Sequence, residues 1–485
     1  MNLENASPRG ESSTPPAQDL LALHGYKQEL KREIGWFSSF CMSFSIIAVT
    51  TGLFATYGAG LQTAGPAFIW TWPVVGVGQL FLAIVFAKLA RRIPLSGMAY
   101  QWTRELGGDS IAWWAGWLMI IQLLTGLAAV CYAMASYALP VVGVAATDRN
   151  IIIATTAVLL TIAVINHMGV KIATFVNDLM VLAQIAVILV VGILLLVVAV
   201  KHHTNSFHFL FTHPGHPGGW AFVGPLAFSS LAAAWTITGF EAAANLAEET
   251  KLPERLVPFA IVSSEIFSVI IGFVILLGFT IAIPSLDEAT KSSAPFAYII
   301  GYHFPPVFTT IVMAIILVEI YACALANLTI VGRVVWAMAR DRQLPASAWF
   351  SHLSVRKVPA NAMWFLAILA AIFTWWAKFQ VVIAGVSGLA AYSTYVMVVI
   401  CALWNRPHKW QISGEASHEP IVPRELGIVA LIWLVICMGA LTLPSSAWVN
   451  DEAIAVGLVI GFGVWLGIRK SRRSETGPEA GQLAS

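Results

Sequence analysis

Long apolar stretches separated by short polar segments dominate the chain. An α-helix needs about 20 residues to cross a hydrocarbon core ~30 Å thick, and twelve stretches meet that length or approach it. They lie near residues 36–62, 66–90, 111–141, 151–167, 174–200, 221–246, 259–283, 306–338, 361–377, 380–404, 425–443 and 452–468. The pattern predicts an all-α integral membrane protein of about twelve transmembrane helices, whose principal partner is the lipid bilayer.

Composition supports the same class. Of the 485 residues, 58% are hydrophobic and only 11% are charged, which is more apolar side chain than a soluble fold of this length could cover. The five cysteines, which all fall inside predicted spans, are Cys41, Cys131, Cys323, Cys401 and Cys437. We therefore expect no disulfide, no zinc site and no cofactor.

The basic residues predict the orientation. Cytoplasmic loops retain Lys and Arg, whereas short translocated loops avoid them. If the N-terminus is cytoplasmic, almost all basic residues fall inside, and the exceptions are Arg149, Lys201, Lys291 and Lys378. We expect both termini to be cytoplasmic, in a plasma membrane or in the inner membrane of a bacterium. Topology thus explains the basic residues, and no nucleic-acid partner is expected.

Two predicted spans carry a Thr-Gly step near their middle. Thr51-Gly52 lies in the first span and Thr238-Gly239 in the sixth, and such pairs are poor helix formers. Both helices are expected to break there. Because five spans separate the two steps, the second enters from the opposite face, as in an inverted repeat with discontinuous helices. The alternative is that the glycines only permit close helix packing.

A broken helix in a bilayer must line a cavity or be covered by protein. At such a break, free N–H groups favour an anion and free carbonyls accept from a cation. A zwitterion, with a carboxylate and an ammonium, satisfies both. The sequence therefore indicates a cavity for a small charged solute between the first and sixth spans.

Glu241 lies within the sixth span, where an acidic residue costs roughly 2.5–3.5 kcal/mol on insertion scales. It therefore needs a partner, a proton or a cavity. One hypothesis is that Glu241 takes up and releases a proton during transport, or couples the two halves of its helix. The alternative is a permanently hydrogen-bonded structural acid.

Four motifs resemble those of a known family. The chain is similar to the amino acid/polyamine/organocation permeases, and within them to the branch of amino acid, GABA and choline permeases. The matching segments are Gly25-Tyr26-Lys27-Gln28-Glu29-Leu30-Lys31-Arg32, Ile93-Pro94-Leu95-Ser96-Gly97-Met98-Ala99-Tyr100-Gln101-Trp102, Gly239-Phe240-Glu241 with Ala247-Glu248-Glu249-Thr250-Lys251-Leu252-Pro253-Glu254-Arg255 and Pro258, and Arg333 with Ala339-Arg340-Asp341 and Leu344-Pro345. The resemblance covers roughly residues 20–470.

The resemblance implies a leucine-transporter-like fold, in which two five-helix repeats of opposite orientation surround a central site. The expected parts are a disordered cytoplasmic tail (1–33), the first repeat (34–200), an extracellular His-rich loop (201–220), the second repeat (221–405), helices 11 and 12 with the preceding loop (406–468), and a cytoplasmic C-terminal tail (469–485). The implied function is secondary transport of amino acids or small amines such as GABA. Transport of choline or polyamines, and amino acid exchange, stay open.

Carried over by position, the family's carboxylate cradle in the first span falls on Thr50, Thr51, Gly52, Leu53 and Phe54. Its first glycine is a threonine here, so a hydroxyl can contribute instead. In the sixth span, the residues that match family positions offering carbonyls or an aromatic gate to the substrate amine are Trp235, Thr238 and Phe240, next to Gly239. An aromatic face beside an ammonium adds roughly 0.5–2 kcal/mol.

Gln184 is a departure from the family pattern. Many proton-coupled relatives carry a lysine at the matching position of the fifth span, and the amine is absent here. Proton symport through that lysine is therefore not expected. Exchange, facilitated uptake, or proton coupling built around Glu241 stay open, and the sequence does not identify the solute.

Other conspicuous groups have simpler interpretations. The five histidines between the fifth and sixth spans, which are typical of a solvated loop rather than a metal site, are His202, His203, His208, His213 and His216. Trp113, Trp114 and Trp117 are interpreted as an interfacial anchor. We also expect a cytoplasmic polar network that favours one access state, formed by Arg91, Arg92, Arg340 and Asp341.

Two other classes of protein fit less well. A membrane enzyme would need catalytic groups that converge on the spans, and no such motif is recognisable. An ion channel would need a continuous polar lining or a repeated filter loop, and the spans hold too few polar residues for one.

Overall fold

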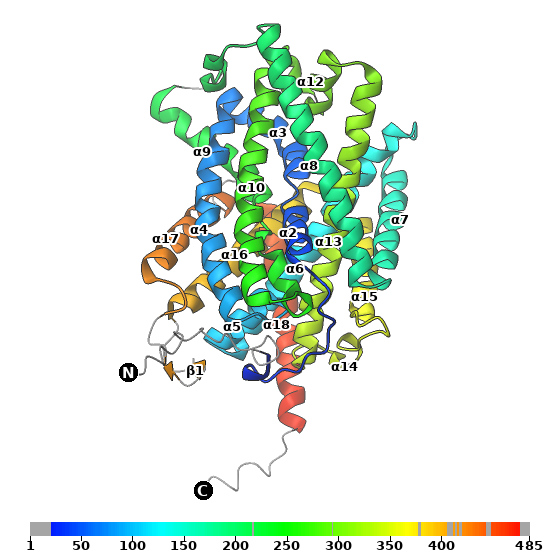
Figure 1. The fold of residues 1–485 in the computed structure, drawn as a ribbon, viewed down its shortest axis with the longest axis vertical. Coiled ribbons are helices and arrows are strands. Elements are labelled where there is room, and N and C mark those ends of the chain that lie inside the picture. Colours follow the sequence, from blue (N-terminus) through cyan, green and yellow to red (C-terminus); the bar gives the residue numbers. More distant parts are fainter. Residues whose placement is uncertain are drawn as a thin grey trace, which may run out of the picture.

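The chain forms a bundle of long helices with short connections at both ends (Figure 1). The computed structural model describes residues 21–215, 218–292, 294–376, 380–404, 411–412, 415–416, 420–442 and 448–475. The long helices are α2 (Trp36–Ile47), α3 (Val49–Ala64), α4 (Thr71–Arg92), α6 (Asp109–Val141), α7 (Asp148–His167), α8 (Val170–Lys201), α9 (Val223–Thr236), α10 (Pro253–Ile281), α13 (Pro306–Arg340), α15 (Ala360–Trp376), α16 (Gln380–Trp404), α17 (Arg424–Thr442) and α18 (Trp448–Glu475).

Shorter elements connect the long helices. They are the helices α5 (Met98–Gly107), α11 (Leu286–Lys291), α12 (Pro295–His303) and α14 (Ser347–Phe350), the 3-10 helices η1 (Gly65–Trp70), η2 (Phe207–Phe211), η3 (Gly219–Phe222) and η4 (Phe240–Glu249), and the strands β1 (Gln411–Ile412) and β2 (Glu415–Ala416). The two strands form a small antiparallel pair.

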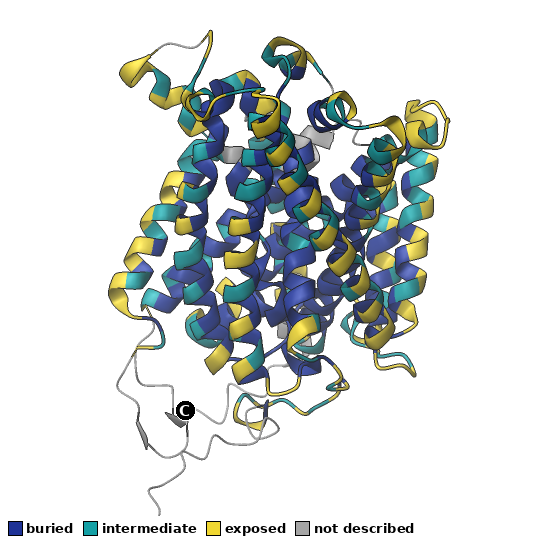
Figure 2. Cartoon of the chain, turned by 45° about the horizontal axis from the view of Figure 1, so that its top comes forward, coloured by how far each residue is buried: buried dark blue, intermediate teal, exposed yellow. Residues whose placement is uncertain are grey.

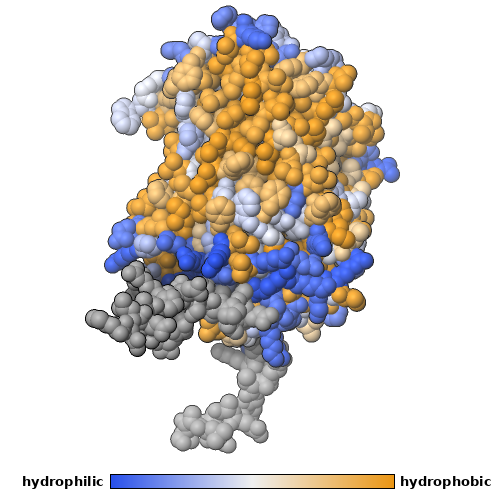
Figure 3. All heavy atoms as spheres, viewed as in Figure 1, coloured by the Kyte–Doolittle hydropathy of each residue, from blue (hydrophilic) through white to orange (hydrophobic). Residues whose placement is uncertain are grey.

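The outer surface suits a bilayer. Within the described residues, eleven helical segments are long and apolar enough to span a membrane, and Ala360–Trp375 is a shorter apolar helix. Figure 3 shows hydrophobic residues covering the sides of the bundle, with hydrophilic residues gathered towards its ends. Figure 2 shows that exposed positions lie on the outward faces of the helices, around a buried interior. The predicted all-α membrane class is confirmed.

The first membrane span is broken, but not at the predicted residues. α2 ends at Ile47, Ala48 adopts a left-handed conformation with φ 45°, and α3 begins at Val49. Thr51 and Gly52 lie inside α3, so the expected break at that step was wrong. Gly52 serves close packing instead, because a Cβ on it would lie 2.3 Å from the Thr236 side chain.

The sixth span is broken where expected. α9 ends at Thr236, Gly239 has φ 93°, and the 3-10 helix η4 follows from Phe240. Glycine is suited to this position because it adopts positive φ at little cost. A Cβ on Gly239 would also lie 2.1 Å from Ile46, so the two breaks touch each other.

The broken spans lie antiparallel at the centre of the bundle. α2 packs against η4, and α3 packs against α9, so the first half of each span meets the second half of the other. α13 contacts both halves of the first span, and α6 packs against both α13 and α16. This arrangement supports the inverted relation expected from the Thr-Gly steps.

The N-terminal segment packs against one end of the bundle, which we call the terminal end (Figure 1). Leu21, Leu30 and Ile34 are buried there. The expectation of disorder was therefore wrong for residues 21–33, whose apolar side chains find a covered surface. The rest of that predicted tail, residues 1–20, lies outside the described residues. At the other terminus α18 continues to Glu475, beyond the expected start of a tail at residue 469, and residues 476–485 lie outside the described residues.

The predicted tryptophan anchor is partly buried. Trp113 is buried, stacks on Trp117 with ring centroids 5.4 Å apart, and donates to the carbonyl of Gln343 at 2.9 Å. It therefore fastens α6 to the segment that follows α13. The predicted loop between α8 and α9 holds η2 and η3; among the described residues there is no cluster suited to a metal ion, and His216 lies outside them.

Candidate functional site

A small cavity lies where the two breaks meet. Its volume is about 60 Å³. Five of the predicted binding residues line it, namely Thr51, Gly52, Trp235, Thr238 and Gly239. The other lining residues are Ile46, Ile47, Ala48, Gln122, Leu123, Gly126, Val130, Thr236, Cys323, Asn327 and Ser387. Helices α2, α3, α6, α9, α13 and α16 thus all contribute to one cavity.

The remaining predicted residues lie outside the lining, as far as the structure describes it. Phe240 is fully buried and packs against Phe86 and Tyr395, with ring centroids 5.9 and 6.1 Å away. Leu53 is buried in the core. The N–H of Thr50 donates to Glu319 at 3.2 Å, so a protein carboxylate occupies part of the predicted carboxylate cradle.

The cavity lining combines apolar side chains with uncharged polar ones among the residues described. Hydroxyl and amide groups come from Thr51, Thr238, Gln122, Asn327 and Ser387, and Trp235 adds an aromatic face. The end of α2 contributes backbone carbonyls, and the start of α3 contributes backbone N–H groups. Such a site can hold a molecule of zero net charge with one positive and one negative end.

Aromatic residues pack on the opposite side of the cavity from the terminal end. Phe54 stacks on Phe296 at 4.6 Å, and Tyr57 lies 4.7 Å from the same ring. Phe279 contacts Phe296 at 4.1 Å. Phe54, the last position of the predicted cradle, therefore belongs to an aromatic cluster that joins α3, α10 and α12.

Glu241 is buried behind the break in the sixth span. The Tyr395 hydroxyl donates to its Oε1 at 2.7 Å, while its Oε2 has no hydrogen-bond partner among the residues that the structure describes. The N–H of Gly239 donates in turn to the Tyr395 oxygen at 3.3 Å. Tyr395 thereby links α16, the break and Glu241. A second buried acid, Glu265 of α10, lies within electrostatic range of Glu241, and neither of its oxygens has a hydrogen-bond partner in the described part of the chain.

Glu319 is a third buried acid, on α13, and our sequence analysis missed it. Its Oε1 accepts from the N–H of Thr50 at 3.2 Å and from Nε2 of Gln184 at 2.5 Å. The signal was present, because Glu319 interrupts the apolar stretch Val318-Glu319-Ile320. The argument that singled out Glu241 applies equally to it, and to Glu265.

The terminal end is closed by buried ion pairs that unite three of the four motifs. Arg333 of α13 makes two hydrogen bonds to Glu249, at 2.8 and 3.2 Å, and both side chains are 1% exposed. Arg340 makes two to Glu248, at 2.9 and 3.0 Å. Glu248 also accepts from the N–H of Ser96 at 3.1 Å. The loop after α4, the end of η4 and the end of α13 therefore meet here.

A second group of contacts ties the N-terminal segment to the same place. Asp341 accepts from the Tyr26 hydroxyl at 2.9 Å and from the Tyr100 hydroxyl at 2.8 Å, and pairs with Arg104 at 2.8 Å. The Arg340 guanidinium lies 4.0 Å from the Tyr26 ring centroid. We call these two groups of contacts together the terminal network.

Burial and the nearby carboxylate of Asp341 both raise the pKa of Tyr26 and of Tyr100 above the ordinary value of a phenol. Both hydroxyls therefore remain protonated, and able to donate to Asp341, throughout the physiological pH range. Arg340 and Asp341 belong to this network as expected. Arg91 and Arg92 were expected there too, but both side chains are exposed at the end of α4, and Arg104 supplies the positive charge instead.

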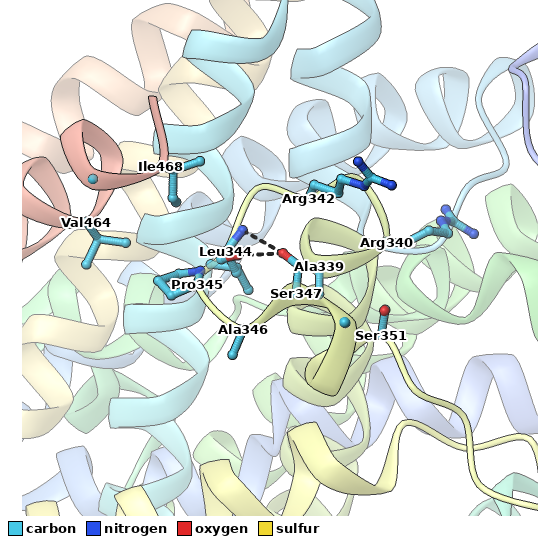
Figure 4. Close-up of a pocket in the computed structure, with 12 residues that line it drawn as sticks. Ala339, Arg340, Arg342, Leu344, Pro345, Ala346, Ser347, Ser351, Val464 and Ile468 are labelled. Atoms are coloured by element: carbon cyan, nitrogen blue, oxygen red, sulfur yellow. Dashed lines mark hydrogen bonds between the residues drawn. The ribbon is translucent and has the colours of Figure 1, made fainter. Parts of the chain in front are cut away.

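A larger cavity lies elsewhere. About 770 Å³ in volume, it lies at the terminal end between the segment after α13 and the helix α18 (Figure 4). Val464 and Ile468 form its apolar side, and the side chain of Arg340 extends away from them. Ser347 closes the turn by donating to the carbonyl of Leu344 at 2.5 Å. This cavity lacks the two broken helices, so we place the functional site at the smaller one.

Comparison with known proteins agrees with the motifs. The sequence model of the amino acid permease family matches residues 34–465. The chain is 26% identical to the amino-acid permease BAT1 of Arabidopsis thaliana, over 97% of this chain and 98% of that protein. It is 26% identical to the branched-chain amino acid permease BcaP of Bacillus subtilis, over 92% and 95%. Amino-acid permease 2 of Neurospora crassa is 29% identical over 82% of this chain and 77% of that one.

Proposed function

Because the chain belongs to the amino acid permease family, we propose that it is a secondary active transporter that moves amino acids, or related small amines such as GABA, by alternating access. The observation that carries this proposal is the meeting of two interrupted spans at one small cavity. In the bilayer, exposed helix ends of this kind persist where they serve a ligand or are covered by protein.

The lining favours a zwitterion. Thr51 and Gly52 near the start of α3 are proposed to face the carboxylate, and Trp235, Thr238 and Gly239 at the end of α9 are proposed to face the ammonium. A polyamine or choline carries a net positive charge and would require a compensating carboxylate. The described lining residues include no Asp or Glu, so an amino acid is the better fit.

The cavity is too small for free diffusion. Its volume of about 60 Å³ is well below the ~300–1,000 Å³ of ordinary ligand pockets, and the terminal network closes one side of it. We therefore propose that this conformation is occluded and that transport requires the two broken spans to separate. A permanently open channel, the distant alternative, does not fit such a closed centre.

We propose that the terminal end is cytoplasmic and that the protein resides in a plasma membrane, or in the inner membrane of a bacterium. Arg91, Arg92 and Arg104 lie at this end, near the end of α4 and in α5, and positively charged loops face the cytoplasm. Opening of the terminal network then gives the inward-facing state.

Glu241 is proposed to couple the two halves of the sixth span. The support for this role is the chain of hydrogen bonds from Gly239 through Tyr395 to Glu241, which connects the break to η4. Direct proton uptake by Glu241 is the alternative, and its pH dependence distinguishes the two roles, as described in the Discussion.

The test is competition uptake with purified protein in liposomes. Radiolabelled leucine and GABA are each competed with a panel of amino acids, choline and putrescine at two pH values. Saturable uptake inhibited by amino acids supports the proposal. Inhibition by choline or putrescine alone would identify an amine transporter, and current without saturable uptake would identify a channel.

A further inference from the structure

We propose that Glu319, paired with Gln184, is a proton-binding site that couples proton movement to opening of the first span. This inference rests on the proposed transport function and adds the coupling ion to it. The site lies outside the cavity lining, on α13 and α8, and reaches the break through the N–H of Thr50.

Glu319 lies where its charge affects the break in the first membrane span. Thr50 is the second residue of α3, and the N-terminus of a helix carries partial positive charge that stabilises an anion. The carboxylate of Glu319 accepts from this N–H at 3.2 Å. An ionised Glu319 therefore holds the start of α3 against α13, and protonation weakens that attraction.

Acceptor oxygens at the site lack hydrogen-bond donors, and a bound proton would provide one. Glu319 is 1% exposed. Its Oε1 accepts from the N–H of Thr50 and from Gln184, while its Oε2 has no hydrogen-bond partner among the described residues. Oε1 of Gln184 is likewise buried without a partner in the described part of the chain. The Thr50 hydroxyl and the Thr51 N–H also lie within interaction range of the carboxylate. Unpaired buried acceptors are unfavourable, so the two unpaired oxygens favour a donor between them.

A single proton supplies the missing donor. A protonated carboxyl and a primary amide can form two hydrogen bonds to each other, one donated by each group. Nε2 of Gln184 already donates to Oε1 of Glu319, and a proton on Oε2 can be donated to Oε1 of Gln184. Gln184 thus accommodates both forms of the acid, because an amide both donates and accepts, whereas a lysine ammonium only donates.

The groups around Glu319 do not provide a fixed compensating charge. α8 presents the neutral amide of Gln184. α3 presents the N–H and hydroxyl of Thr50 and the N–H of Thr51. On α13 the nearest titratable group is the thiol of Cys323, with Cys131 of α6 beyond it. The next acid along α8, Asp178, accepts from Ser38 of α2 at 2.5 Å.

The site also adjoins the cavity. Cys323 lies one helical turn after Glu319 on α13 and lines the cavity, as does Asn327 a turn further on. Residues four apart lie on one helix face. Movement of α3 relative to this face of α13 therefore changes the cavity directly, which connects proton binding to substrate binding.

The test compares the wild-type protein with Glu319→Gln in proteoliposomes. The substrate is an amino acid that the wild type exchanges, chosen from those used in the competition uptake. Glutamine mimics the protonated acid, because its amide can form both hydrogen bonds with Gln184. The wild type should accumulate the amino acid up to about tenfold across one pH unit, acid outside, for one proton per substrate. Glu319→Gln should bring the amino acid only to equal concentrations inside and outside, a ratio of about one. It should still exchange internal for external amino acid at the normal rate.

The matched control is Glu265→Gln, which changes another buried acid of the same size. It should retain accumulation. The proposal is overturned if Glu319→Gln accumulates like the wild type, or if Glu265→Gln abolishes accumulation while Glu319→Gln does not. If the wild type exchanges the amino acid but a pH gradient does not drive its accumulation, the coupling proposal is also overturned. The proposed transport function would be unaffected by that result. Absence of any saturable exchange would instead refute the transport function.

A second measurement does not depend on transport. Infrared difference spectra recorded on acidification of the purified protein report the carbonyl band of a newly protonated carboxyl. The proposal requires that Glu319→Gln remove one such band that Glu265→Gln leaves in place. An unchanged spectrum in Glu319→Gln would contradict it.

Discussion

The acids of this protein belong to two contrasting regions. At the terminal end, Glu248 and Glu249 each receive two hydrogen bonds from an arginine, and Asp341 pairs with Arg104. In the middle of the bundle, Glu241 and Glu319 have neutral hydrogen-bond partners. As far as the described residues go, each also has one unpaired oxygen, and both oxygens of Glu265 are unpaired.

The two groups of acids differ in what balances their charge. A buried carboxylate held by a bidentate arginine is fixed, and its partner cannot be removed without leaving an uncompensated charge. A buried acid with only neutral partners is balanced more easily by a proton. We therefore assign closure of the terminal end to the first group, and coupling to Glu241 and Glu319 of the second.

The largest expected effect comes from breaking a terminal ion pair. Replacing Arg333 by Met leaves Glu249 buried without its countercharge, which typically costs about 3–5 kcal/mol. We expect loss of folded protein, seen as a lower melting temperature of the detergent-solubilised protein or as aggregation on size-exclusion chromatography.

The double variant Arg333→Met with Glu249→Leu is the control. Since it removes both charges, it should recover part of the lost stability. A single variant that is as stable as the wild type would show that this pair is not a structural element, and would remove the contrast between the two regions.

Asp341→Ala should open the terminal end rather than unfold the protein. It removes the acceptor for Tyr26, Tyr100 and Arg104, and one hydrogen bond to a charged group is worth ~1.5–3 kcal/mol. Cys323 lines the cavity and serves as a native probe. We expect its labelling by a membrane-impermeant thiol reagent from the terminal side to accelerate by about tenfold or more.

Asp109→Ala is a matched control, because Asp109 pairs with the same Arg104 at 3.0 Å but is 58% exposed. It should leave the labelling rate close to that of the wild type, and Cys323→Ser should abolish labelling. Equal rates in Asp341→Ala and the wild type would count against a closing role for the network.

Glu241→Gln distinguishes between the two proposed roles of this buried acid. The Tyr395 hydroxyl can still donate to the glutamine carbonyl, so the fold should persist. If Glu241 couples the half-helices, exchange and uptake should fall together, severalfold, with unchanged pH dependence. A selective loss of pH dependence would favour proton uptake by Glu241, and unchanged uptake with unchanged pH dependence would remove it from the mechanism.

The smallest expected effect is at alkaline pH. Burial raises the pKa of Tyr26 above its ordinary value near ~10, so the unfolded chain releases this proton before the folded one. The contribution of Tyr26 to stability is therefore complete below about pH 10 and declines as pH rises further. Melting temperatures of the wild type and Tyr26→Phe should converge above that pH; a constant difference would contradict this.

The sequence predicted the architecture better than the details of the site. Apolar length and the Thr238-Gly239 step identify the spans and one break, because helix interruption by glycine is a local property. The other break falls at Ala48, where the residue type gives no signal and contacts between α3 and α9 decide the conformation. Phe240 was expected at the substrate but packs on Phe86 instead, since the 3-10 geometry of η4 determines where that ring lies.

The sequence also did not predict which groups pair with the buried charges. Glu241 was singled out as an acidic residue within the sixth span, whereas Glu319 was overlooked although its neighbours are equally apolar. Neither the pairing of Glu319 with Gln184 nor that of Arg333 with Glu249 follows from spacing along the chain, because each joins segments far apart in sequence.

The central claim is that the broken spans hold the transported solute between them. Protection of Cys323 from thiol labelling, measured in the wild type with saturating amounts of the amino acid that it transports, tests this most directly. The account predicts that labelling slows with a concentration dependence matching that of transport. Labelling that stays equally fast with and without a saturating transported amino acid would contradict it.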